Sequence, residues 1–291
     1  MKRAYKVVDV FTSRPLLGNP VAVILDADGL TTEQMQAIAN WANLSETTFV
    51  LPPTDAEADY QLRIFTPRGE LPFAGHPTLG SAHALLESGR IKPRSEGRLV
   101  QQCGMGLLEL RLSGQSDKGQ LSFQLPSAKI EPVQRPDIAE LQPILGARFV
   151  MDTVPSSVDV GPVWIVAQMP DAATVLNLRP DFARLSEFER RLGVTGVTVF
   201  GKRLHGDTAI EVRTFAPSSG VQEDPVCGSG NGSVAAFQWK HGLFPRTGGQ
   251  YVASQGQCVN RDGRVHVRID ADGAIHLGGE CLTCIDGELT I

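Results

Sequence analysis

Two halves of this chain repeat one pattern, and this repeat constrains the fold more than any other feature. An Arg-x-Phe-x-Pro motif begins at Arg63 and leads to the loop AGHP; a second begins at Arg213 and leads, after a slightly longer loop, to CGSG. Strand-like segments and a helical segment precede each motif in the same order. Chance similarity between β-rich segments is the alternative. Recurrence in order and spacing favours an internal duplication, which places Ala74 and Cys227 at matching positions just before a helix.

Apolar alternation predicts a chain of mostly strands with a few helices, an α+β protein. A helix is expected in 31–43, with Thr31 or Thr32 as its N-cap, and another in 182–192. A third helix is expected to start at Pro77 and stop at Gly89, which places His76 near its N-cap. The expected strands lie in 5–11, 19–25, 47–53, 60–67, 99–112, 120–126, 161–167, 197–203 and 211–217.

One stretch between the repeats, 126–137, is rich in proline and charge and predicts a linker. The chain is then expected to form an N-terminal lobe of residues 1–126 and a C-terminal lobe of residues 127–291. Packing of the last strand on the first lobe is left open as an alternative.

Composition excludes several classes of protein. The hydrophobic fraction of 42%, a mean hydropathy of -0.07 and the lack of a long apolar run argue against a membrane protein. The net charge of -5 gives no support for a nucleic-acid partner. The first residues reach strand-like alternation without an apolar signal core, and the five cysteines are scattered rather than framed for disulfides. We therefore expect a cytoplasmic protein with a small-molecule ligand.

The two glycine-containing loops are candidate anion sites. Glycines before a helix let a ligand approach the unpaired N–H groups and the positive end of the helix dipole. Either loop alone is more typical of a tight turn. Because both loops occur in one duplicated chain, we predict that they face one another across a single site. Such a site would suit a small carboxylate.

Three acidic side chains lie close to these elements. Glu46 falls between a helix end and an apolar strand, where partial burial raises a carboxyl pKa toward the range of a general base; a capping or solvated turn glutamate is the more frequent alternative. Glu223 and Asp224 precede the second loop, and one of the two is interpreted as a plain turn residue before Pro225.

Cys227 adjoins glycines at a predicted helix N-terminus, a setting that favours thiolate. It is interpreted either as an acid/base or nucleophile, or as an inert buried thiol. The pair Cys281 and Cys284 lacks the further ligands that a zinc site needs, and His76 and His83 lack acidic or cysteine partners at metal spacing. No metal is expected. The sequence GSGNGS fits neither common nucleotide loop.

Four stretches that cover nearly the whole chain resemble the PhzF-like phenazine-biosynthesis family: DVFTSRPLLGNPVAVILDA, NLSETTFVLPP, IFTPRGELPFAGHPTLGSAHAL and VQEDPVCGSGNGS. This family shares the diaminopimelate epimerase fold. The resemblance implies two pseudo-symmetric lobes, each a curled, barrel-like sheet around a central helix. It also implies an active site between the lobes that uses no cofactor, and a homodimer.

The resemblance also assigns roles to residues. The glutamate of the family's SE motif, which moves a proton between carbons of the substrate, falls on Glu46, and the histidine of GHP falls on His76. The aspartate and serine that hold polar groups of the substrate fall on Asp224 and Ser229. The remaining expected substrate-binding residues are Asn19, Gly75, Gly228 and Gly230.

Two departures from the family pattern shape the functional prediction. Epimerases of this fold use a cysteine from each lobe, whereas here Ala74 replaces the first and only Cys227 is present; a symmetrical two-thiol racemase is therefore excluded. The phenazine isomerases have threonine at the position of Cys227. We expect a cofactor-independent isomerase of the trans-2,3-dihydro-3-hydroxyanthranilate isomerase type. The alternatives are a two-base epimerase using Glu46 and Cys227, a cysteine hydrolase, or a non-catalytic protein that binds a small carboxylate.

Overall fold

The structure, a computed structural model, describes residues 2–114 and 119–291. It divides into two compact units, each described here by itself. The first contains the residues up to Gln124 together with Gly278–Ile291, and the second contains Leu125–Leu277. The prediction of a linker in 126–137 is wrong. Strand β9 (Lys129–Pro132) and the start of helix α3 (Arg135–Leu145) occupy this stretch.

The first unit is built on a sheet of mostly antiparallel strands. Its last strand in sequence pairs with its first, while β2–β3 and β4–β6 are the parallel pairs. In spatial order the strands are β18 (Cys281–Thr290), β1 (Lys2–Val10), β2 (Asn19–Ile24), β3 (Thr47–Leu51), β4 (Tyr60–Phe65), β6 (Arg98–Cys103), β7 (Gly106–Ser113) and β8 (Gln120–Gln124). The short β5 (Glu70–Leu71) forms a hairpin with β4.

The second unit repeats this pairing pattern. Two parallel pairs, β11–β12 and β13–β15, flank the antiparallel pair β12–β13, as β2–β3 and β4–β6 flank β3–β4 in the first unit. In spatial order its strands are β9, β10 (Ser156–Asp159), β11 (Val163–Gln168), β12 (Gly196–Lys202), β13 (Ile210–Ala216), β15 (Gly249–Gln255) and β16 (Gly263–Ile269). Strand β14 (Val221–Asp224) forms a hairpin with β13. Strand β17 (Ile275–Gly279) follows β16, and its last two residues belong to the first unit.

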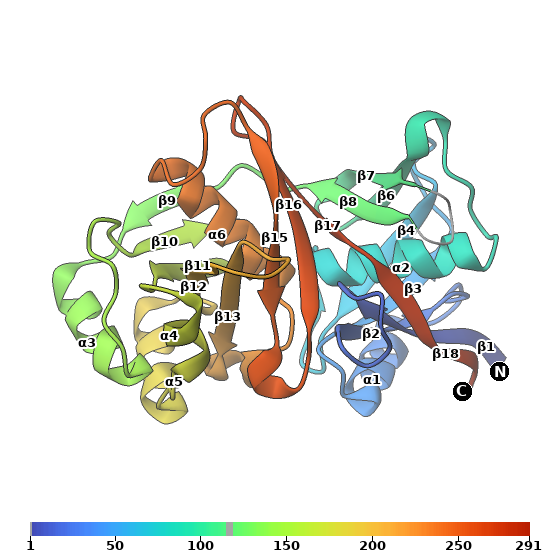
Figure 1. Cartoon of the computed structure of the whole chain (residues 1–291). Coiled ribbons are helices and arrows are strands. Elements are labelled where there is room, and N and C mark those ends of the chain that lie inside the picture. The colour runs from blue at the N-terminus through green and yellow to red at the C-terminus, as the bar shows by residue number, and fades with distance from the viewer. Residues whose placement is uncertain (1, 115–118) are drawn as a thin grey trace. The chain divides into compact units, whose positions relative to one another are not determined.

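Each sheet curls around one helix, which confirms the predicted fold class. Helix α2 (Gly75–Glu87) packs against β1, β2 and β3, and also against β18 and β8 at the two edges of its sheet (Figure 1). Helix α6 (Gly228–Lys240) packs against β10, β11, β12 and β16. A helix that contacts both edges of one sheet requires the sheet to curl. Most side chains of both helices are buried, as expected for central helices.

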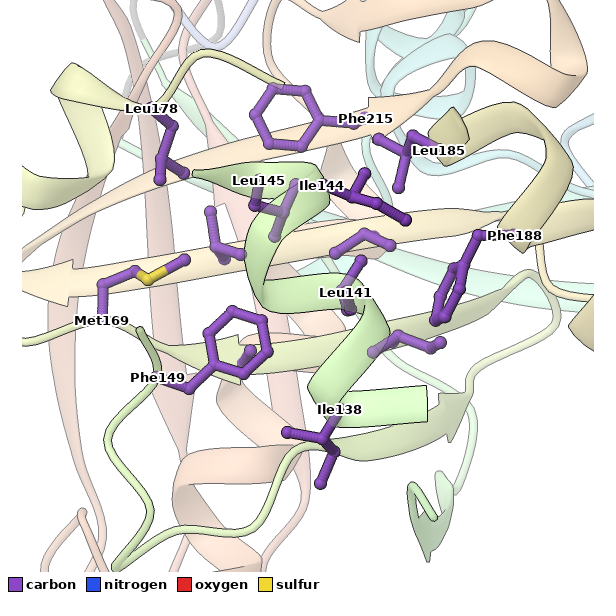
Figure 2. Close-up of a cluster of buried hydrophobic side chains, with 14 of the residues drawn as sticks. Ile138, Leu141, Ile144, Leu145, Phe149, Met169, Leu178, Leu185, Phe188 and Phe215 are labelled. Carbon is purple, nitrogen blue, oxygen red and sulfur yellow. The ribbon is translucent and has the colours of Figure 1, made fainter. Parts of the chain in front are cut away.

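Further helices cover the outer face of each sheet. Helix α1 (Thr32–Ala42) is capped by Thr31, one of the two expected N-caps, with a capping box between Thr31 and Gln34, and it buries Met35, Ile38 and Ala39. In the second unit α3, α4 (Ala172–Asn177) and α5 (Phe182–Leu192) take this place. Figure 2 shows the cluster that joins them to the sheet, with Ile138, Leu141, Ile144, Leu145, Phe149, Met169, Leu178, Leu185, Phe188 and Phe215 labelled. Central strands are therefore buried on both faces.

Three short 3-10 turns complete the described elements: η1 (Ser95–Gly97), η2 (Pro217–Ser219) and η3 (Gln257–Val259). None of the helices in the described ranges has the length and apolar character needed to cross a membrane.

The start of α2 differs from its predicted position. The helix begins at Gly75, two residues before Pro77, and Ala74 is its N-cap. His76 therefore lies inside the first turn instead of near the cap. Proline is tolerated throughout the first turn because the N–H groups there have no partner within the helix, so Pro77 did not mark the first helical residue.

Candidate functional site

The Arg-x-Phe-x-Pro motif of the first unit fixes the hairpin that leads to α2. Arg63 on β4 donates from Nε and Nη2 to both carboxylate oxygens of Glu70 on β5, each at 2.7 Å. The guanidinium also lies over the ring of Phe65, 5.0 Å from its centroid. This two-point contact is geometrically specific. It sets where the chain leaves the hairpin toward the loop AGHP.

The second unit repeats this arrangement in a more buried form. Arg213 donates from Nε and Nη2 to Glu223 at 3.0 and 2.8 Å and lies 4.9 Å from the Phe215 ring centroid. The side chains of Arg213 and Glu223 are only 5% and 6% exposed. Glu223 is thus structural. Because successive strand residues face opposite sides, Asp224 projects from the other face of β14.

Both helix N-termini follow these hairpins at the same distance. Ala74 comes four residues after Glu70, and Cys227 comes four residues after Glu223. Ala74 is the N-cap of α2 and Cys227 is the N-cap of α6. The predicted equivalence of these two residues is therefore confirmed, and Gly75 and Gly228 are the first residues of their helices.

In the first unit, Glu46 and His76 are brought together. Glu46 immediately precedes β3, and its Oε2 lies 3.3 Å from Nε2 of His76 in the first turn of α2. The two side chains are 16% and 7% exposed. Burial lowers the pKa of His76 to about 3, so its ring is neutral at neutral pH. The pair is therefore a carboxylate beside an uncharged imidazole rather than an ion pair.

In the second unit, Asp224 lies beside the start of α6. Burial raises its pKa to about 6, although the N–H of Val226 donates to its Oδ1 at 3.0 Å and opposes the shift. The residue keeps some exposed surface. A carboxyl group with this pKa changes its charge close to neutral pH and remains accessible to a ligand.

Cys227, Ser229 and Gly230 form the first turn of α6. The thiol Sγ of Cys227 accepts from the N–H of Gly230 at 3.3 Å and lies 3.6 Å from Oγ of Ser229. The side chain of Cys227 is almost fully buried. A Cβ on Gly230 would lie 2.6 Å from Oγ1 of Thr214 and 3.2 Å from Sγ of Cys227, so only glycine fits there.

Two residues of this half-site were missed from the sequence. Gln255 on β15 accepts from the N–H of Cys227 at 3.1 Å and donates to the carbonyl of Asp224 at 2.9 Å, which holds both ends of the turn before α6. Trp164 on β11 donates to Oγ of Ser229 at 3.0 Å. Both partners are distant in sequence, and no local motif marks either one.

Asn19 and Gly75 complete the set of predicted residues. Asn19 is fully buried at the start of β2, opposite Val10 in the strand pairing. A Cβ on Gly75 would lie 2.9 Å from the ring of Phe123, which requires glycine or a shift of that ring. Within the first unit the structure thus brings Glu46 to His76, and within the second it brings Asp224, Cys227, Ser229 and Gly230 together.

The described part of the chain contains no cluster of three or more His, Cys, Asp or Glu side chains suited to a metal ion. All five cysteines are free. Cys281 and Cys284 both lie on β18, and burial raises the pKa of Cys281 to about 12, which keeps it a thiol.

Comparison with known proteins identifies the family. The model of the family described as "Phenazine biosynthesis-like protein" matches residues 8–287. "Trans-2,3-dihydro-3-hydroxyanthranilate isomerase" of Pseudomonas aeruginosa is 37% identical over 271 residues, which cover 92% of this chain and 91% of that protein. "Antisense-enhancing sequence 1" of Schizosaccharomyces pombe is 42% identical over 295 residues, covering 99% and 98%.

Solved structures agree on the fold. A Bacillus anthracis phenazine biosynthesis protein of the PhzF family superposes with a TM-score of 0.89 at 23% identity, and both chains are covered completely. A hydroxyproline epimerase from Agrobacterium vitis superposes with a TM-score of 0.67 at 13% identity, over 99% of this chain and 92% of that one. The assignment to a family with isomerases of the epimerase-like fold is thereby confirmed. The chain belongs to the phenazine biosynthesis-like protein family.

Proposed function

We propose that this protein is a cofactor-independent isomerase that moves a proton between two carbons of a small carboxylate. The contact of 3.3 Å between Glu46 and a buried, neutral His76 carries the proposal. A carboxylate that exchanges a substrate proton needs restricted solvent access and a partner that leaves it basic. The named isomerase relatives support the same assignment.

Glu46 removes the proton from one carbon and returns it to another, so that a double bond shifts and no oxidant or reductant is consumed. Neutral His76 matters for this step. An imidazolium would stabilise the carboxylate and weaken it as a base, whereas a neutral ring 3.3 Å away adds no charge. We therefore assign His76 to restricting where the Glu46 carboxylate lies without lowering its basicity.

The two helix N-termini and Asp224 bind the substrate in this proposal. Ala74 has no side-chain acceptor for the first-turn N–H groups of α2, which leaves them to a carboxylate. Ser229 and the N-terminus of the 13-residue helix α6 stabilise negative charge that develops on oxygen. Asp224 accepts from a hydroxyl or amino group, and Asn19 is proposed as a further contact.

The first compound to test is trans-2,3-dihydro-3-hydroxyanthranilate, the substrate class named for the relative. This compound, and each member of a panel of unsaturated amino and hydroxy carboxylic acids, is incubated separately with the protein in D2O. Proton NMR then follows the signal at each carbon position. Deuterium that enters a carbon only in the presence of the protein supports the proposal. Compounds that bind without exchange at any carbon contradict it and favour a non-catalytic binding protein.

A second candidate, the two-base epimerase, is favoured by one observation. Cys227 occupies in the second unit the N-cap position that Ala74 occupies in the first, and its Sγ accepts from the N–H of Gly230. In this reaction Glu46 and Cys227 would exchange the proton at one carbon. Cys227→Ser should then abolish inversion at that carbon; unchanged rate and stereochemistry of deuterium incorporation would rule this candidate out.

The cysteine hydrolase alternative has less support. It requires His76 to take the thiol proton, and an imidazole whose pKa is about 3 is a weak base for that transfer. Detection of a trapped acyl intermediate on Cys227 would support the hydrolase alternative.

We also propose a cytoplasmic homodimer. The family resemblance and the five free cysteines support this proposal. Light scattering during size-exclusion chromatography tests the dimer, and fluorescence microscopy of a tagged copy tests the location.

A further inference from the structure

Trp164 lies on β11, and its indole reaches the first turn of α6. The residue is 4% exposed, and its Nε1–H donates to Oγ of Ser229 at 3.0 Å. A buried indole N–H needs an acceptor. Here the acceptor is Ser229, a residue proposed to bind substrate.

This bond determines what the Ser229 hydroxyl does. A hydroxyl has one donor and two acceptor positions. Because the indole occupies one acceptor position, the hydroxyl proton is directed away from the indole, and a hydroxyl that accepts a bond is also a stronger donor.

Ser229 Oγ lies 3.6 Å from Sγ of Cys227, and the N–H of Gly230 donates to the same sulfur at 3.3 Å. Either atom of the Ser229–Cys227 contact can be the donor, and Asp224 also bonds the Cys227 side chain. Donation by Ser229 would extend the bonds in one direction, from Trp164 through Ser229 to the N-cap of α6.

We propose that Trp164 is a positioning residue that commits the Ser229 hydroxyl to donating its one proton, to Cys227 in the free protein and to an oxygen of the substrate when substrate is bound. The substrate part rests on the proposed function, whereas the part concerning Cys227 does not. The consequence for recognition is that the ligand atom at Ser229 is a hydrogen-bond acceptor, such as a carboxylate, carbonyl or ether oxygen, and the ligand atom at Asp224 is a donor.

A double-mutant cycle tests this inference with Trp164→Phe, Ser229→Ala and the combination of both. Trp239→Phe is the matched control, since Trp239 is in the same unit and its ring contacts Arg246. The first readout is the rate of alkylation of Cys227 by iodoacetamide as a function of pH, followed on the isolated peptide by mass spectrometry. A change in the access of iodoacetamide to the Cys227 thiol alters the maximal alkylation rate. Loss of a hydrogen-bond donor to the thiolate instead raises the pH at which the rate is half-maximal.

We expect Trp164→Phe to raise the pH of half-maximal alkylation by about 0.5 to 1 unit, the effect of one neutral hydrogen bond. Ser229→Ala should raise it by at least as much, and Trp164→Phe should add nothing in the Ser229→Ala background. With trans-2,3-dihydro-3-hydroxyanthranilate as substrate, the same pattern is expected as a rise in KM of about 3- to 10-fold. Trp239→Phe should change neither quantity.

An equal effect of Trp164→Phe in both backgrounds, or no effect in either, would overturn the inference. The alkylation readout needs no substrate, so it remains decisive if no compound is turned over. If Trp164→Phe does not fold, 15N NMR of the indole N–H groups replaces it. Ser229→Ala should then shift the Trp164 signal and leave those of Trp41 and Trp239 in place; an unmoved Trp164 signal contradicts the inference.

Discussion

Glu189 on α5 makes the stability of the second unit depend on pH. It is fully buried, and its Oε2 accepts from the N–H of Ser218 in η2 at 2.9 Å. Burial raises its pKa from 4.5 to about 7, against the opposing effects of Ser218 and the nearby charge of Arg190. Since η2 leads into β14 and Asp224, this carboxyl group supports the hairpin of the second half-site.

Proton binding to Glu189 is coupled to folding, so its raised pKa makes the free energy of unfolding depend on pH. The folded state holds the Glu189 proton more tightly than the unfolded state, so stability is highest below about pH 4.5 and falls as pH rises through about 7. At 1.36 kcal/mol per pKa unit, the loss is roughly 1 kcal/mol at about pH 5 and roughly 3.5 kcal/mol at about pH 8.5. Glu189→Gln removes this loss, because an amide does not ionise.

Urea unfolding at the two pH values measures the difference between Glu189→Gln and wild type. The amide also buries an NH2 group, which costs about 1–2 kcal/mol at both pH values, so the informative quantity is the change in the difference. We expect the variant to gain about 2.5 kcal/mol relative to wild type between about pH 5 and about pH 8.5. Glu187→Gln, on the exposed face of the same helix, should show no such change. A pH-independent difference for Glu189→Gln would refute the reasoning.

Three other predictions concern the hairpins, the loop and the histidine. Glu223→Gln should lower the free energy of unfolding by about 3–5 kcal/mol, because it leaves the buried charge of Arg213 without a counter-charge. Glu70→Gln should lower it by at most about 1 kcal/mol, since the Arg63–Glu70 pair is more exposed. Equal costs of the two substitutions in urea unfolding would contradict this. Gly230→Ala should cost about 1–3 kcal/mol through overpacking, while Gly287→Ala, in open space, should be neutral by the same assay. The ring signals of His76 in NMR should stay those of a neutral imidazole down to about pH 5, because burial lowers its pKa; a titration near the pKa of free histidine would contradict its assignment as a neutral partner.

The sequence predicted elements well where the pattern is local. Helix α5 spans Phe182–Leu192, the range expected for it, and the expected central strands occur in both units. The linker prediction for 126–137 was wrong because proline and charged residues are also compatible with a strand or the start of a helix. Pro136 fits the first turn of α3, and Ile138 and Leu141 continue as its buried stripe.

Only those features of the site that depend on neighbouring residues in the sequence could be predicted. The positions of Ala74 and Cys227 follow from the repeat, since capping depends on neighbouring residues. Trp164 is 65 residues from Ser229, and Gln255 is 28 residues from Cys227. Contacts of this kind depend on how strands are ordered in a sheet, which a single sequence does not encode in a readable motif.

The shift in the pKa of His76 has the same origin. A histidine before a helical proline is compatible with a charged or a neutral ring, and only its burial in the first turn of α2 decides between them. Glu46 likewise gains its partner from an element that starts about 30 residues later in the chain.

The most direct test of the account is the rate of deuterium transfer from D2O to a substrate carbon in Glu46→Gln. The substrate is trans-2,3-dihydro-3-hydroxyanthranilate or whichever carboxylate the wild type exchanges, and Glu57→Gln is the control with an exposed glutamate in the same unit. We expect the exchange rate to fall by about 10²- to 10⁴-fold in Glu46→Gln, the usual contribution of a general acid/base. KM should be nearly unchanged, and Glu57→Gln should be fully active. Exchange that survives in Glu46→Gln would contradict the account, because the proton would then be carried by another group.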